Sequence, residues 1–109
     1  MSERDPALLV GDIRDALARI GRYVAGLDLD AFLADEKTAD AVIRNLEIIG
    51  EASRRMPEDC RKLHPAVPWP QMAGLRNRIV HDYAGVDLAI VWEIVTRSLP
   101  ELRKQLDSM

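Results

Sequence analysis

The residues best suited to chemistry gather in one stretch of eight, which runs from Arg76 to Tyr83 and reads RNRIVHDY. It holds two arginines, one histidine and one tyrosine, although the whole chain has only two histidines and two tyrosines. A guanidinium offers a planar fork of donors that matches phosphate oxygens, and an imidazole exchanges a proton near neutral pH. Arg76 and His81 therefore indicate a site that acts on a phosphodiester, with Asn77 as a further polar candidate.

The element expected to position this stretch is a helix that begins at Pro70 and ends before Gly85. Proline is tolerated at the first helical position, and glycine commonly follows the last one. At about 100° per residue, Asn77 and His81 share a face of such a helix, whereas Arg76 and His81 lie about 140° apart. A site that uses both needs a frayed helix end or a second copy of the chain. We favour the second copy, and therefore expect a homodimer.

The charge of the chain is unevenly distributed along the sequence. The net charge of −3 argues against a nucleic-acid partner. However, residues 1–43 hold 5 Lys+Arg against 9 Asp+Glu, residues 44–81 hold 7 against 4, and residues 82–109 hold 3 against 5. The basic excess is thus confined to the middle segment, as expected of a local phosphate-contacting surface. In the alternative interpretation these are ordinary solvated helix faces, and the histidine of the stretch is satisfied in the core or an interface.

The stretch resembles the signature of the HEPN superfamily of small helical ribonucleases and nucleotide-binding proteins. That signature is an arginine and a polar residue, three more residues, a histidine and, two places on, a tyrosine. Within the superfamily the chain resembles the HepT-like ribonuclease toxins of HepT/MntA-type toxin–antitoxin systems. The resemblance extends to residues 41–52, which read AVIRNLEIIGEA, and to Pro68-Trp69 and Gly74-Leu75 ahead of the stretch.

The resemblance implies a metal-independent endoribonuclease of a type VII-like pair. The RNA 2′-hydroxyl would attack the adjacent phosphorus, with His81 as general base or acid. Arg76 would stabilise charge on the phosphoryl oxygens, and Asn77 would orient the phosphate or the imidazole. The implied partners are RNA, a second copy of the chain and a nucleotidyltransferase antitoxin that adenylylates Tyr83, and a larger hetero-oligomer with the antitoxin is compatible with them. We expect no cofactor, because no residues have metal-ligand spacing and no phosphate-cradling glycine loop is present.

Two other functional classes stay open at this point. The first is a non-catalytic helical module that binds nucleotide or a partner protein through the motif. The second is a helical DNA-binding domain, although the acidic ends of the chain and the lack of a basic recognition helix argue against it.

Apolar residues recur at steps of three and four in four long segments, and no segment shows the alternation of a strand. We predict helices from Pro6 to near Gly26, from Thr38 to before Pro57, from Pro70 to near Tyr83 and from Val86 to residue 106. We also predict a kink at Pro100, a short turn around Phe32 that Asp28 or Asp30 caps, and one helical turn at 58–63 inside a proline-rich crossover. This pattern indicates an all-α, up-and-down four-helix bundle that forms a single domain over residues 1–109.

Four residues predict how the elements pack. Gly50, inside the second helix, costs about 1 kcal/mol relative to alanine, which makes sense if another backbone passes close to it. Arg44 and Glu51 lie seven residues apart, on one side of the same helix, so either could face the motif. We expect Trp69 to anchor the crossover to the bundle.

The remaining features concern the compartment. The single cysteine, Cys60, cannot form an internal disulfide. The charged N-terminus lacks the apolar core of a signal peptide, and no apolar run approaches the roughly 20 residues of a membrane span. We therefore expect a soluble, cytoplasmic protein.

Overall fold

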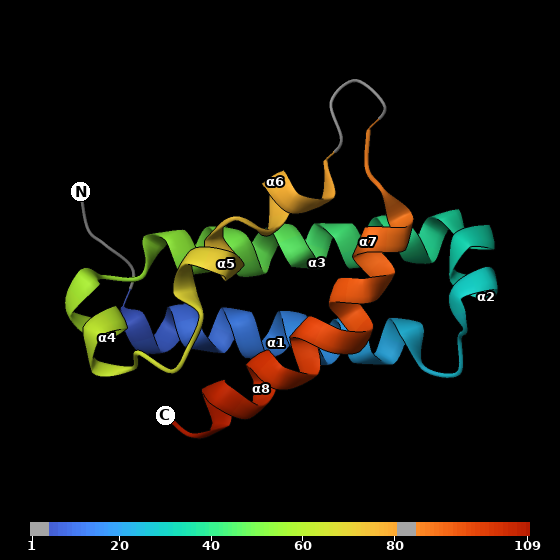
Figure 1. Cartoon of the computed structure of the whole chain (residues 1–109). Helices are drawn as coiled ribbons and strands as arrows, with labels where there is room; N and C mark the ends of the chain where they lie inside the picture. Colours follow the sequence, from blue (N-terminus) through green and yellow to red (C-terminus); the bar gives the residue numbers. More distant parts are fainter. Residues whose placement is uncertain (1–4, 81–84) are drawn as a thin grey trace.

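Two long antiparallel helices, α1 and α3, form the layer on which the C-terminal half of the chain is laid (Figure 1). The computed structural model describes residues 5–80 and 85–109. The helices are α1 (Pro6–Val24), α2 (Leu29–Ala34), α3 (Glu36–Arg55), α4 (Glu58–Leu63), α5 (Trp69–Ala73), α6 (Leu75–Ile79), α7 (Leu88–Glu93), the π-helix η2 (Ile94–Ser98) and α8 (Leu99–Asp107). No β-strand forms within these ranges, so the predicted all-α class is confirmed. No helix among the described residues is long and apolar enough to cross a lipid bilayer.

Each long helix buries one apolar stripe against the other. The buried members of these two stripes include Leu9, Ile13, Leu17 and Ile20 of α1, and Val42, Leu46 and Ile49 of α3. Removal of these side chains from water is the main favourable contribution to the fold. One polar contact helps to fix how α1 is aligned along α3. In it, Arg19 Nε donates to Oδ1 of the buried Asn45 at 2.8 Å.

Local capping sets where α1, α2 and α3 begin. The Asp5 carboxylate accepts from the Ala7 N–H, and the Asp28 carboxylate accepts from the Ala31 N–H, so the predicted start of α1 and the turn around Phe32 are confirmed. The predicted start of α3 at Thr38 is two residues late. Asp35 caps this helix instead, because it accepts from the Thr38 backbone N–H at 3.0 Å and from the Thr38 hydroxyl at 2.7 Å. Both bonds hold the pKa of the Asp35 carboxyl below its ordinary value.

The helix predicted from Pro70 to near Tyr83 is wrong in its length. It is broken into α5 and α6 at Gly74, and α6 ends at Ile79. Val80 is extended and forms an isolated antiparallel bridge with Val86, while the Asp87 N–H donates to the Ile79 carbonyl at 2.8 Å. The 140° separation of Arg76 and His81 assumed one continuous helix, so it no longer supports a homodimer.

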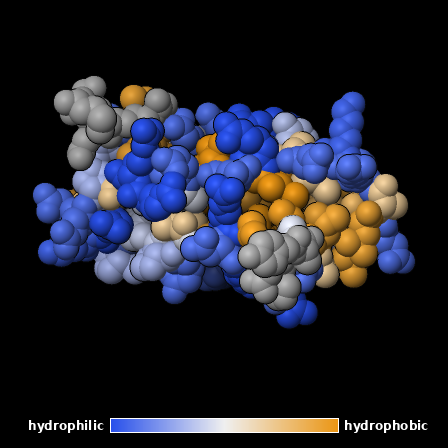
Figure 2. All heavy atoms as spheres, turned by 90° about the horizontal axis from the view of Figure 1, so that it is seen from above, coloured by the Kyte–Doolittle hydropathy of each residue, from blue (hydrophilic) through white to orange (hydrophobic). Residues whose placement is uncertain are grey.

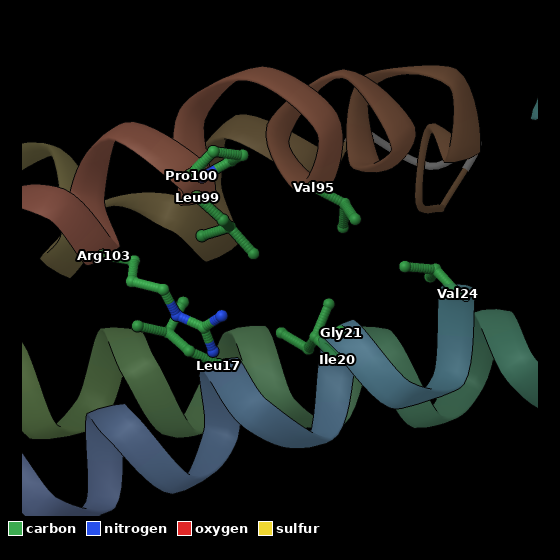
Figure 3. Close-up of a pocket in the computed structure, with 8 residues that line it drawn as sticks. All are labelled: Leu17, Ile20, Gly21, Val24, Val95, Leu99, Pro100 and Arg103. Carbon is green, nitrogen blue, oxygen red and sulfur yellow. The ribbon is translucent and has the colours of Figure 1, made fainter. Parts of the chain in front are cut away.

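The last long helix changes direction where η2 joins α8, as Figure 1 shows. The Leu99 N–H donates to the Ile94 carbonyl, five residues back, and the next residue is Pro100, which has no N–H to donate. A π-turn and a proline are both recognised causes of a bend, so the predicted kink is confirmed. A mainly apolar cavity of about 250 Å³ lies between α1 and the η2–α8 segment. Figure 3 shows the side chains that line it, with Arg103 among them.

The contact between α3 and α5 explains both Gly50 and Trp69. A Cβ atom at Gly50 would lie 3.3 Å from the Met72 carbonyl oxygen, so the predicted close approach of another backbone is confirmed. Trp69 is buried, and its Nε1 donates to the His64 carbonyl at 3.1 Å. The indole therefore anchors the crossover to the bundle, as predicted.

Gly50→Ala is expected to lower the free energy of unfolding by about 1 kcal/mol, because the added methyl group meets a backbone oxygen that moves only with α5. Gly21→Ala is the matched control, since a Cβ there meets nothing within 4 Å. It should raise the free energy of unfolding by about 1 kcal/mol through helix propensity alone. Urea denaturation measures both, and equal stabilisation by the two substitutions would contradict the close contact.

Candidate active site

Three consecutive polar residues of the motif, Arg76, Asn77 and Arg78, are exposed on α6. The short helix is held by its two ends, because Leu75 and Ile79 are buried in the core. These anchors lie four residues apart on one face, so the three residues between them point away from the core. Arg76 and Asn77 have no side-chain hydrogen bond or ion pair with another described residue. No described residue therefore occupies the polar groups that these two side chains could offer to a ligand.

Arg76 lies at a cleft between α6 and α3, which we call the α3 cleft. Its volume is about 280 Å³, and it is lined by Arg44, Glu47, Gly50, Glu51, Arg54, Ala73 and Arg76. Arg44 and Glu51, either of which could face the motif, are both exposed and line this cleft together with Arg76. Three arginines and two glutamates line the cleft, so its lining carries a small positive excess.

The ion pairs around the cleft leave Arg44 and Arg76 without an acidic partner in the described part of the chain. Glu51 is paired with Arg54 and also lies 3.6 Å from the Arg55 guanidinium. Its negative charge is therefore largely offset. Two unpaired guanidinium groups from segments far apart in sequence thus share one cleft, which favours an anionic ligand.

Arg78 lies on the opposite side of α6 from the cleft. Its Nη1 is 3.5 Å from the Ser98 hydroxyl, and it lines a separate cavity of about 630 Å³ together with Arg97 and Glu101. Successive helical residues are turned by about 100°, which explains how two arginines two positions apart reach different elements. The two arginines of the motif therefore do not form one site.

His81 and Tyr83 lie outside the described residues. Among the described residues that flank them in sequence, Val80 and Val86 form an isolated antiparallel bridge. Arg76 lies in α6, five residues before His81 in the sequence.

Glu47 and Arg54 are cleft residues that the sequence interpretation missed. They complete a row on α3 with Arg44 and Glu51, at steps of three, four and three residues. This spacing marks one helix face, so the row could have been found from the sequence. The position of this row beside Arg76 could not have been found from the sequence, because it depends on the contact between α3 and α5.

Figure 2 views the molecule from above, on the side that carries α6. Most of this face is hydrophilic, and apolar atoms gather mainly toward the end where α2 and α7 lie in Figure 1. The exposed large apolar side chains of the described residues include Leu29 and Leu33 of α2, and Val80 after α6.

Comparisons with known proteins agree on one family. The family model described as "Ribonuclease HepT-like" matches residues 13–109. The chain is 41% identical to a "Probable ribonuclease HepT" of Thermococcus cleftensis, over 90% of this chain and 89% of that protein. It is 38% identical to a "Putative RNase" of Methanocaldococcus jannaschii, over 98% of each chain. No solved structure gives a significant match.

Proposed function

The chain belongs to the HepT-like ribonuclease family, and on this premise we propose that it is a metal-independent endoribonuclease, the toxin of a type VII-like toxin–antitoxin pair. The observation that carries the proposal is the exposed Arg76 guanidinium, which has no acidic partner among the described residues and lies in α6, ahead of His81 in the sequence. A cation that can bind phosphate and, five residues later in the sequence, an imidazole that can transfer a proton are the minimum that this chemistry needs.

The proposed reaction needs no group outside the chain and its RNA. A bond forms between the ribose O2′ and the adjacent phosphorus, and the bond from phosphorus to the 5′-oxygen breaks. The imidazole of His81 takes the proton of the 2′-hydroxyl as general base, or protonates the leaving 5′-oxygen as general acid. Arg76 stabilises the charge that develops on the phosphoryl oxygens, and Asn77 orients the phosphate or the imidazole.

We propose that two copies of the chain act together. One imidazole cannot be base and acid in the same step, and a two-fold axis beside the motif would supply a second His81. Further proposed partners are the nucleotidyltransferase antitoxin and a larger assembly that contains it. Light scattering at micromolar concentration should give the mass of a dimer for the isolated chain, and a strict monomer would rule out the shared site.

Purified protein is expected to cleave RNA in the presence of EDTA and to leave DNA of the same sequence intact, because DNA lacks the attacking 2′-hydroxyl. Gel analysis of labelled oligonucleotides measures both results. An absolute requirement for added magnesium would contradict the mechanism, and binding of RNA without any cleavage would support a non-catalytic module instead.

A further inference from the structure

The α3 cleft extends the candidate site well beyond the motif. Arg44 and Arg54 stand at the two ends of its row on α3, ten residues apart, which is about 15 Å of helix at 1.5 Å per residue. This length exceeds the spacing of neighbouring phosphates along one nucleic-acid strand. The row is therefore long enough to run past more than one nucleotide.

The described residues that line the cleft include no aromatic side chain on which a base could stack. They offer guanidinium donors, which match phosphate oxygens. The cleft volume of about 280 Å³ is slightly below the roughly 300–1,000 Å³ typical of small-molecule pockets. A strand backbone that passes Arg76 fits these features better than an enclosed small ligand does.

We propose that Arg44, assisted by Arg54, binds the RNA phosphates next to the one that Arg76 contacts, so that the α3 cleft is a subsite for single-stranded RNA. The proposal rests on the proposed ribonuclease function for the identity of its ligand. Arg44 is exposed and has no acidic partner in the described part of the chain, whereas Arg54 shares its charge with Glu51. Arg44 therefore contributes more to binding than Arg54.

Recognition in this subsite acts through phosphate and is independent of base sequence. Glu47 and Glu51 lie between the two arginines in the row, so the attraction is concentrated at its ends. A contact with a phosphate that does not react is equally strong in the ground state and the transition state. Its loss raises KM and leaves kcat largely unchanged.

Fluorescence anisotropy of a labelled single-stranded RNA tests the subsite without relying on cleavage, in a His81→Ala background. Arg44→Ala should weaken binding about tenfold, the effect of one lost hydrogen bond to a charged group. It should also make the slope of log K against log salt shallower by about 0.7, as expected for one lost phosphate contact to a single strand. Arg44→Lys keeps the cation and should restore most of the affinity.

Arg55→Ala is the matched control, because Arg55 is also exposed on α3 and also lies near Glu51 but does not line the cleft. It should bind RNA within about twofold of the parent, since exposed charge pairs contribute little. Equal binding by the Arg44→Ala and Arg55→Ala proteins, or no binding by the parent, would overturn the subsite. A third result is that the protein with His81 intact never cleaves RNA, while the His81→Ala protein still binds it through Arg44. That result would contradict the proposed chemistry and leave the subsite standing.

Discussion

Replacement of His81 by alanine is expected to slow RNA cleavage by about 10²–10⁴-fold, the usual contribution of a general acid or base. The chain offers a matched control in its only other histidine, His64. The backbone carbonyl of His64 accepts a hydrogen bond from the Trp69 indole N–H. The His64→Ala protein keeps this backbone hydrogen bond and should cleave RNA at the parental rate. Initial rates on one labelled RNA, with circular dichroism to confirm folding, measure the difference. Parental activity in the His81→Ala protein would contradict the role of His81 as general acid or base, even though the chain belongs to the family.

Arg76→Ala belongs to the same experiment and should lower kcat by about 10²–10³-fold, as loss of a donor to the developing oxyanion does. Arg78→Ala is the control on the same helix, because its guanidinium lies toward Ser98, away from the α3 cleft. Both arginines are exposed, so neither substitution disturbs the core. If the two variants lose equal activity, the effect is one of general charge and Arg76 has no special role.

Adenylylation of Tyr83 by a nucleotidyltransferase antitoxin is expected to abolish cleavage. A nucleotide monophosphate on the phenolic oxygen would bring phosphate charge to the motif, where it competes with the RNA phosphate for Arg76. Co-expression with the cognate transferase should make the chain heavier by one or more adenylyl units, as measured by intact mass. The modified protein should then fail to cleave RNA that the unmodified protein cuts.

The control for this modification is the only other tyrosine, Tyr23, which is exposed on α1. Tyr23→Phe should still gain mass and lose activity, whereas Tyr83→Phe should do neither. A mass increase that persists in Tyr83→Phe would place the modification on another residue. Modified protein that still cleaves RNA would separate the modification from control of the toxin.

The interpretation of the sequence was most accurate where structure depends on neighbouring residues. Capping by Asp5 and Asp28 acts within three residues, so it was readable without the fold. Pro100 likewise marked the bend of the last helix, since the missing N–H is a property of the residue itself. The start of α3 was missed by two residues although its signal is also local, because Asp35 and Thr38 are both plausible caps and their joint hydrogen bonds favour Asp35.

The sequence by itself determined the helical class, the family and the chemical groups of the motif, because periodicity, capping and residue type are properties of short segments. Only the tertiary structure decided that the motif helix ends at Ile79, since the bridge between Val80 and Val86 competes with continued helix. It also decided that Arg76 and Arg44 line one cleft, because the absence of a side chain at Gly50 lets α5 approach α3. The contact at Gly50 joins segments far apart in the chain, so its energy depends on how the helices pack rather than on the order of the residues in either segment.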